Sequence, residues 1–526
     1  MAVLAMALSA LVTYGAGAQT VLRGRLNADI LSLDPGVRRD ENTDAVVLHL
    51  VEGLVAFRED GSIGPLLAQS WTVSDDGRTY RFALRPGILF HNGATLTADD
   101  VVWSLKRYLA PATRWRCRFE FGAGGITGIE DIAAPDPGTV LVTLSRATPF
   151  FLKILARPDC GGAGILHRDS WGADGALITP IGTGPFRLGE WRRNQFIELD
   201  RFDRYAALPG DRDGNAGNRQ ALVDKVRFLI IPDGSAARAA LLRGNLDVLD
   251  ALSPAEVAGV QGQPGIRVEI NPTMDFYELL FQTHDPLLSD VRMRRAIALA
   301  IDTAGLTRAV TWGTARANAS PVPVVSPYYG PVEAQPRPKD VAEARRLTAE
   351  AGYTGQPIRL ITNRRYPQMF DSAVLIQAMA AEAGINVEIE TLDWATQLDR
   401  YAKGDYQMMA FAFSARLDPS LNFGSIIGDK AKDPRKVWDT PAARDLLRQS
   451  IDEAEPAQRQ QIFDELHRQF MADVPAVILF NTSRIAAVRQ NVTGYKGWPA
   501  AQQRLWGVGL EPPDRPRANA AKDGPA

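Results

Sequence analysis

Arginines alternate with a tryptophan and a cysteine between residues 114 and 118. If this segment is extended, Arg114, Arg116 and Arg118 point to one side, and Trp115 and Cys117 point to the other. Planar guanidinium groups gathered on one side could hold a carboxylate or a phosphate through paired hydrogen bonds. The same pattern is also typical of a basic face in solvent, so the residues alone leave both interpretations open.

A second group of candidates follows an apolar run in the C-terminal half. Residues 407–419 read QMMAFAFSARLDP, which predicts a strand that runs into a loop. Open α/β sheets bind ligands at the carboxyl ends of their strands. The candidate ligand contacts here are Trp394, Phe411, Phe413, Arg416 and Asp418. The aromatic side chains could equally belong to the core, and an Asp-Pro pair also begins ordinary turns.

The sequence contains no convincing catalytic or metal-binding motif. G-x-S-x-G, H-E-x-x-H and S-x-x-K are missing at any convincing position, and the five histidines are scattered. Cys117 and Cys160 lack matching histidines for a zinc site. In an oxidising compartment they predict one disulfide, with separately buried thiols as the alternative. We therefore expect no catalytic residue, cofactor or metal, and a secreted hydrolase of peptides or esters is the competing hypothesis.

The composition is that of a large globular protein with nearly balanced charge. A chain of 526 residues, with 45% hydrophobic and 23% charged residues, exceeds what one core usually serves, which predicts two or more lobes. The formal net charge of -2 gives no reason to expect nucleic acid as a partner.

Both ends of the chain differ in composition from the middle. Residues 1–18 form an apolar run that ends in AGA, which is typical of a secretory signal peptide, although no Lys or Arg precedes Arg23. A buried first helix is the alternative. No cysteine follows this run, so we expect a periplasmic protein without a lipid anchor. Residues 511–526 lack apolar periodicity and are expected to be disordered.

The elements that must position the candidate side chains are clearest in residues 64–109. A turn signal at 75–77 precedes residues 79–84, where apolar and polar side chains alternate as in a strand with one buried face. After a second turn, Thr97 and Asp100 have the spacing of a helix cap. Further on, helices over 340–351 and 371–383 alternate with strands over 358–362 and 387–391, which predicts a mainly parallel sheet.

Several short sequence segments, in the order in which they occur along the chain, resemble those of a known family. LLAQSW, VSDDGRTYRFALRPGILFHNG and LTADDVVWSL follow one another between residues 66 and 105, and PIGTGPFR and LLSDVRMRRAIALAID follow later. Together they resemble the family-5 extracellular solute-binding proteins, the peptide and nickel-chelate receptors of bacterial ABC importers. The resemblance covers nearly all of the chain after residue 18.

The resemblance implies an α/β, two-lobed periplasmic-binding-protein fold of the large class, hinged by two crossing segments. The expected parts are a signal peptide over 1–18, a first lobe from 19–60, 180–269 and 480–510, an accessory subdomain of that lobe over 61–179, a second lobe over 270–479 and a disordered tail over 511–526. The function implied is capture of a small solute, which is an oligopeptide, a dipeptide or a peptide-like or anionic chelate, between closing lobes and its delivery to membrane permease subunits. We expect the protein to be a monomer. A periplasmic receptor or chaperone on the same scaffold is a further alternative.

The resemblance also bears on the ligand. Nickel-chelate receptors of the family place cleft arginines in two regions of this sequence, for which Arg116 and Arg157 are our candidates, although Arg114 and Arg118 match the first region as well. Peptide-binding relatives place an aspartate where this chain has Ala415, next to Arg416. A peptide-like, opine-like or metal-chelate anion is therefore favoured over an ordinary peptide.

Overall fold

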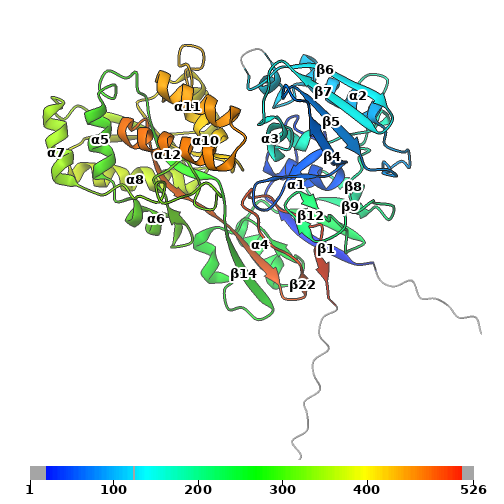
Figure 1. Cartoon of the computed structure of the whole chain (residues 1–526). Coiled ribbons are helices and arrows are strands. Elements are labelled where there is room, and N and C mark those ends of the chain that lie inside the picture. The colour runs from blue at the N-terminus through cyan, green and yellow to red at the C-terminus, as the bar shows by residue number, and fades with distance from the viewer. Residues whose placement is uncertain (1–18, 123–124, 512–526) are drawn as a thin grey trace, which may run out of the picture.

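The structure is a computed structural model that describes residues 19–122 and 125–511. The expected signal peptide and the tail beyond residue 511 lie outside the described residues. The described chain forms two lobes of mixed α/β structure that are joined at one end and face each other (Figure 1). No helix within 19–122 and 125–511 has the length and apolar character that are needed to span a membrane.

The first lobe is built on a seven-stranded mixed sheet. In spatial order its strands are β14 (Ile266–Pro272), β21 (Ser483–Arg489), β13 (Val248–Leu249), β1 (Val21–Leu26), β12 (Lys225–Ile230), β9 (Phe196–Arg201) and β8 (Phe186–Arg192). Only β13, β1 and β12 pair in parallel. Helices α1 (Glu41–Leu50) and α4 (Gly234–Leu242) pack on this lobe, and α1 buries Val46 and Leu50 in its core.

The accessory subdomain combines four antiparallel strands with one long helix. The strands are β4 (Ala68–Val73), β5 (Thr79–Leu84), β7 (Thr139–Leu144) and β6 (Ile129–Asp136). Helix α2 (Ala98–Leu109) begins at the expected cap, because Asp100 Oδ2 accepts from both the backbone N–H, at 3.0 Å, and the hydroxyl, at 2.7 Å, of Thr97. Val101 and Leu105 are buried, as the helical spacing predicts.

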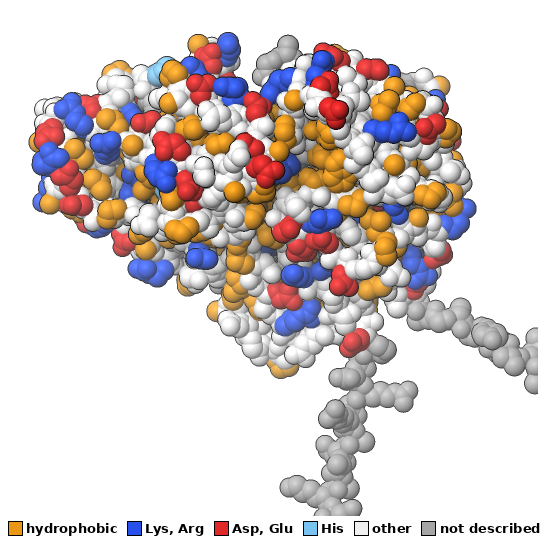
Figure 2. All heavy atoms as spheres, viewed as in Figure 1, with side chains coloured by type: hydrophobic (Ala, Val, Ile, Leu, Met, Phe, Trp, Pro, Cys, Tyr) orange, Lys and Arg blue, Asp and Glu red, His pale blue; other side chains and the backbone are white. Residues whose placement is uncertain are grey.

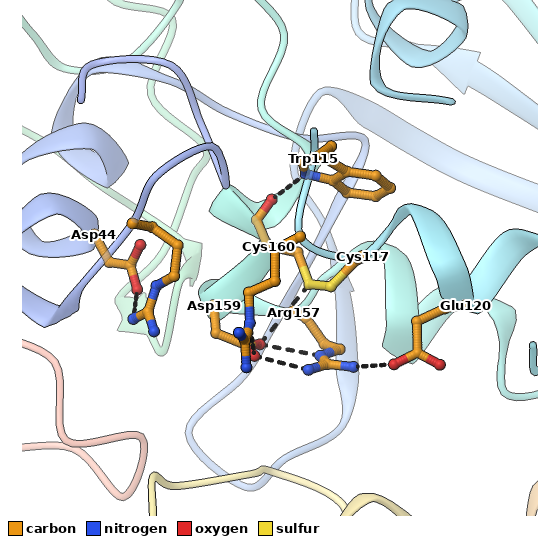
Figure 3. Close-up of a disulfide and its surroundings, with 9 residues drawn as sticks. Asp44, Trp115, Cys117, Glu120, Arg157, Asp159 and Cys160 are labelled. Carbon is orange, nitrogen blue, oxygen red and sulfur yellow. Dashed lines mark hydrogen bonds and ion pairs between the residues drawn. A yellow bond between two sulfur atoms is a disulfide. The ribbon is translucent and has the colours of Figure 1, made fainter. Parts of the chain in front are cut away.

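A disulfide joins two short 3₁₀ turns beside this sheet. Cys117 and Cys160 are bonded, with 5.7 Å between their Cα atoms, and Trp115 Nε1 donates to the Cys160 carbonyl at 2.9 Å (Figure 3). Segment 114–118 is irregular rather than a strand. Even so, Trp115 and Cys117 are buried and the three arginines are exposed, so the two sides are separated as the alternation predicts. Helix α3 (Phe151–Leu155) lies just before the second turn.

The second lobe contains a six-stranded mixed sheet rather than the mainly parallel one that the sequence predicted. Its order is β16 (Arg316–Ala317), β20 (Ala476–Asn481), β15 (Phe276–Phe281), β19 (Met408–Phe413), β17 (Ile358–Asn363) and β18 (Val387–Leu392). Only β19, β17 and β18 pair in parallel. The prediction was wrong for the other half because β15 and β20 are the strands by which the chain enters and leaves this lobe, and they run antiparallel.

Helices cover both faces of this sheet. They are α5 (Val291–Ala300), α6 (Thr303–Thr311), α7 (Val341–Glu350), α8 (Pro367–Glu382), α9 (Trp394–Lys403), α10 (Pro419–Ile426), α11 (Pro441–Asp452) and α12 (Pro456–Asp473). Alternate residues of β15 enter different cores: Leu279 packs with α5 and α8, whereas Leu280 packs with α10 and α12. The remaining described strands form two-stranded ladders: β2 (Val55–Phe57) with β3 (Ile63–Pro65), β10 (Arg212–Asp213) with β11 (Ala216–Gly217), and β22 (Val492–Thr493) with β23 (Gly509–Leu510).

The described chain passes between the lobes twice. One crossing lies between β14 and β15, at 273–275, and the other lies between β20 and β21, at Thr482. Both lie a few residues beyond the expected boundaries at 270 and 480. Asp275 ties the two crossings together, because its carboxylate accepts from the hydroxyls of Thr273 and Thr482.

Candidate ligand-binding site

A cavity of about 680 Å³ lies between the two lobes. The first lobe lines it with Asp60, Ser62, Ile63, Phe150 and Lys153, among others, and the second lobe with Pro327, Tyr328, Glu453, Arg459 and Gln460. In Figure 2 the surface is hollowed between the lobes, and hydrophobic side chains lie inside the hollow. A ligand in this space would touch both halves of the molecule.

Asp418 lies in a buried cluster of charges that bridges the lobes. Its carboxylate accepts from Arg459 at 2.8 and 3.0 Å, and from Lys153 of the accessory subdomain. Burial acts to raise the pKa of Asp418, but Lys153 and Arg459 hold it below its ordinary value. Asp418 also caps α10 by accepting from the Ser420 N–H at 2.9 Å. A cationic ligand group could reach this carboxylate only by displacing a partner that it already has.

Further contacts between the lobes surround this cluster. Arg146 of the accessory subdomain donates to Asp452 of α11 at 2.6 Å. Leu417 is 5% exposed and belongs to the same apolar cluster as the accessory core, against which Ala415 also packs. The lobes of this structure therefore touch each other, as in a closed form.

Arg157 is buried in the first lobe between two acidic residues, and it is not among the residues that line the cavity. It is 6% exposed and donates to Glu120 at 2.7 Å and to Asp159 at 2.7 and 3.0 Å (Figure 3). Burial acts to raise the pKa of Asp159, but Arg157, together with Arg116 and Arg39, lowers that pKa below its ordinary value. The guanidinium group is thus held in place by the protein's own carboxylates.

Two further arginine–aspartate pairs extend this wall. Arg116 is more exposed than Arg157, and its Nε donates to Asp159 at 3.1 Å. Arg39 pairs with Asp44 of α1. Burial raises the pKa of Asp44 to about 7 although Arg39 acts in the opposite direction, and Asp159 contributes to the rise. The first lobe therefore presents arginines backed by buried carboxylates.

Arg416 faces this wall from the second lobe. Burial lowers the pKa of its guanidinium to about 10, and charges of the first lobe act on it as well: Asp159 raises that pKa, whereas Arg157 lowers it. The guanidinium carbon lies 4.9 Å from the centre of the Phe413 ring. The structure thus brings Arg416 opposite Arg116 and Arg157, which the sequence separates by more than two hundred residues.

The three aromatic candidates differ in their exposure. Phe411 is 4% exposed and stacks on Tyr401, with 4.5 Å between ring centres, so it belongs to the core of the second lobe. Phe413 lies at the edge of the same core, under Arg416. Trp394 is half-buried and contacts Phe411, with 5.8 Å between ring centres. Trp394 and Phe413 are therefore better placed than Phe411 to meet a ligand.

Sequence reasoning missed Lys153, Arg459 and Tyr328. The Arg459 guanidinium carbon lies 5.1 Å from the centre of the Tyr328 ring. No local motif marks Arg459 as a site residue, because it is one of two arginines on an ordinary amphipathic helix. Lys153 is likewise a single cation in a short helix. Within the described ranges, no cluster of His, Cys, Asp and Glu could hold a metal ion.

Glu278 is a buried carboxyl group beneath the Arg416 side of the cleft. It lies on β15 opposite Phe411, is completely buried, and neither of its side-chain oxygens has a hydrogen-bond partner among the described residues. Burial raises the pKa of Glu278 well above its ordinary value, although Arg416 acts in the opposite direction. The folded protein therefore favours the protonated form of this side chain.

Replacing Arg157 with Met should lower the free energy of unfolding by about 3–5 kcal/mol, because the buried Glu120 loses its ion-pair partner and Asp159 keeps only Arg116. Arg192→Met is the matched control: Arg192 pairs with Glu190 in solvent, and losing an exposed pair costs about 1 kcal/mol or less. Urea denaturation at neutral pH measures both values. Equal losses in the two variants would contradict the structural role of Arg157.

Replacing Glu278 with Gln should stabilise the protein more at high pH than at low pH. The unfolded carboxyl ionises near its ordinary pKa of 4.5, whereas burial raises the pKa of the folded carboxyl, which therefore keeps its proton to higher pH. Wild-type stability therefore falls as the pH rises above about 4.5 toward the raised pKa, and Gln removes this loss. Melting temperatures of both proteins between about pH 5 and 8 test this, and a constant difference between them would refute it.

Comparison with known proteins places the chain among binding proteins. Residues 62–434 match the family described as bacterial extracellular solute-binding proteins, family 5 Middle. The dipeptide-binding protein of Escherichia coli (strain K12) is 25% identical over 497 residues, covering 89% of this chain and 90% of that protein.

Two solved structures resemble the whole described fold. The PBP AgaA of A. tumefaciens R10, in complex with agropinic acid, shares 26% identity with a TM-score of 0.76, covering 93% of this chain and 99% of that one. DppA of Helicobacter pylori, an ABC transporter-associated periplasmic binding protein in complex with the peptide STSA, shares 27% identity with a TM-score of 0.77, covering 94% and 99%. The two lobes, the double crossing and the match over residues 62–434 show that the chain belongs to the family-5 bacterial extracellular solute-binding proteins.

Proposed function

We propose that this protein is the periplasmic solute-binding component of an ABC importer, and that it captures a small anionic solute between its lobes and delivers it unchanged to the permease subunits. It acts as a monomer. The observation that carries the proposal is the placement of Arg116 and Arg157 on one lobe opposite Arg416 on the other. A solute anion placed between them would attract both lobes.

Closure in this proposal depends on the solute. The exposed Arg146–Asp452 pair contributes about 1 kcal/mol or less. The buried Lys153–Asp418 pair loses much of its attraction to the cost of removing both charges from water. These contacts align the closed lobes, whereas differential binding of the solute to the closed form shifts the population toward it.

The solute class follows from the charges that face the cleft. Ala415 offers no carboxylate to a peptide's amino group, and the carboxylate of Asp418 is already held by Arg459 and Lys153. The exposed Arg116 and the half-buried Arg416 favour a carboxylate or a similar anion, with Trp394 and Phe413 as an apolar side. The relatives in complex with a peptide and with agropinic acid support a peptide-like or opine-like solute.

A secreted hydrolase fits the site less well. Chemistry on a peptide or ester needs a nucleophile and a base within hydrogen-bond reach of each other. Ser62 lines the cavity, but its hydroxyl has no hydrogen-bond partner among the described residues, and no histidine is among the described residues that line the cavity. A binding protein needs no such pair, because it returns its solute intact.

The test is a melting-temperature screen of the full mature chain against dipeptides, agropinic acid and ferric EDTA, followed by small-angle scattering with any compound that binds. We expect at least one compound to raise the melting temperature by mass action and to reduce the radius of gyration. The recovered compound should have an unchanged mass. Absence of any shift, or cleavage of the compound, would overturn the proposal.

One variant distinguishes the contact that aligns the lobes from the contacts that bind the solute. Lys153→Met removes the cross-lobe partner of Asp418 but leaves Arg459 in place. Because the removed contact exists only between closed lobes, we expect weaker solute affinity, by roughly threefold to tenfold, with an unchanged solute preference. Arg192→Met, which lies outside the cleft, is the control and should bind as the wild type does. An unchanged affinity in Lys153→Met would exclude the lobe contact from closure.

A further inference from the structure

A pocket of about 490 Å³ on the first lobe is lined by five arginines: Arg38, Arg39, Arg114, Arg116 and Arg118. Gly36, Pro111, Trp115 and Phe119 form the rest of its lining, and no Asp or Glu is among the described residues that line it. The chain as a whole has a net charge of -2. Positive charge is thus concentrated locally in a protein that has none in excess.

The pairing of these arginines leaves the pocket electropositive. Arg39 is paired with Asp44, and Arg116 shares Asp159 with Arg157. Arg118 donates its Nε to the Leu109 carbonyl, which carries no charge. Within the ranges that the structure describes, Arg38, Arg114 and Arg118 form no ion pair with an acidic side chain. Three guanidinium charges therefore remain uncompensated in one small space, where they repel each other.

The pocket has a rigid base. The Cys117–Cys160 disulfide and the Trp115 hydrogen bond to the Cys160 carbonyl fix the segment that carries Arg114, Arg116 and Arg118. The Arg116 N–H donates to the Gly36 carbonyl at 3.0 Å, which joins this segment to the one that carries Arg38 and Arg39. Two segments far apart in sequence are thus locked side by side with their arginines around one hollow.

Backbone conformation at two of the arginines supports a functional reason for this arrangement. Arg38 and Arg114 have φ angles of 47° and 54°, in the left-handed region that non-glycine residues rarely adopt. Such conformations cost about 1–3 kcal/mol each and persist where the surroundings impose them. The fold therefore places both side chains at the pocket against a local preference.

The pocket adjoins the arginines of the first lobe that face Arg416, although it shares no lining residue with the cavity between the lobes. Arg116 lines the pocket and also binds Asp159, the carboxylate that acts on Arg416 across the cleft. A solute held between Arg116 and Arg416 could therefore extend one end into the pocket.

The positive charge of the pocket determines which anionic group of a solute fits there. One carboxylate carries a single charge and is satisfied by one guanidinium fork. A phosphate group carries about -1.5 to -2 at neutral pH and offers three acceptor oxygens, which suits three uncompensated guanidinium groups. From this match we infer that the pocket formed by Arg38, Arg39, Arg114, Arg116 and Arg118 binds the phosphoryl group of a phosphorylated solute. The inference deepens the proposed function and rests on it.

The test compares two probes that differ by one phosphate. Isothermal titration calorimetry of the full mature chain, at constant ionic strength, measures O-phosphoserine against serine, with inorganic phosphate and citrate as further probes. We expect O-phosphoserine to bind at least tenfold more tightly than serine, and inorganic phosphate to compete with it. Its affinity should fall steeply with salt, because charge pairing dominates.

Variants locate the binding. Arg114→Gln and Arg38→Gln remove exposed side chains without ion pairs, so both should fold normally and weaken O-phosphoserine by about tenfold or more. Arg243→Gln, an exposed arginine outside the pocket, is the control and should leave the affinity unchanged. Serine binding should be the same in all of these proteins.

The outcomes distinguish this inference from the proposed function. Equal affinities for O-phosphoserine and serine, tighter binding of citrate than of both phosphate probes, or unchanged affinity in both pocket variants would overturn the phosphoryl site. A dipeptide or agropinic acid that still compacts the protein would then leave the proposed function standing. If no compound of either set binds, both fail.

Discussion

Within the described chain, only two backbone segments connect the two lobes, and the rest of the structure depends on this constraint. Both crossings meet at Asp275, whose carboxylate accepts from Thr273 and Thr482. Because the connection lies at one end, the distance between the lobes at the other end is set by side-chain contacts alone. Lys153, Asp418 and Arg459 provide the buried part of those contacts. Their geometry is thus decisive for whether a solute is enclosed.

The arginines of the cleft are positioned before any solute arrives. Arg157 is held by Glu120 and Asp159, and Asp159 also holds Arg116. Ordering a long cationic side chain usually costs conformational entropy at the moment of binding. Here the protein's own carboxylates order these side chains when the chain folds. Binding therefore loses less conformational entropy, which favours tight binding of a small anion. The disulfide at Cys160 fixes the backbone next to Asp159 in the same way.

The sequence predicts the local elements well and the site only in outline. The cap formed by Thr97 and Asp100, and the buried and exposed sides of segment 114–118, depend on neighbouring residues and could be predicted. The antiparallel half of the second sheet could not, because β15 and β20 take their direction from the crossings. The partners of Asp418 could not either: Lys153 and Arg459 lie 265 and 41 residues away along the chain. Charge pairs over such separations exist only in the assembled fold, and no local pattern marks them.

The decisive measurement is a crystal structure of the protein with its solute. We expect an intact anionic compound that contacts Arg116 of the first lobe and Arg416 of the second, with Lys153 still bonded to Asp418 and the crossings at 273–275 and 482 as the connection between the lobes. A compound bound to one lobe alone, or a cleaved product in the cleft, would contradict it.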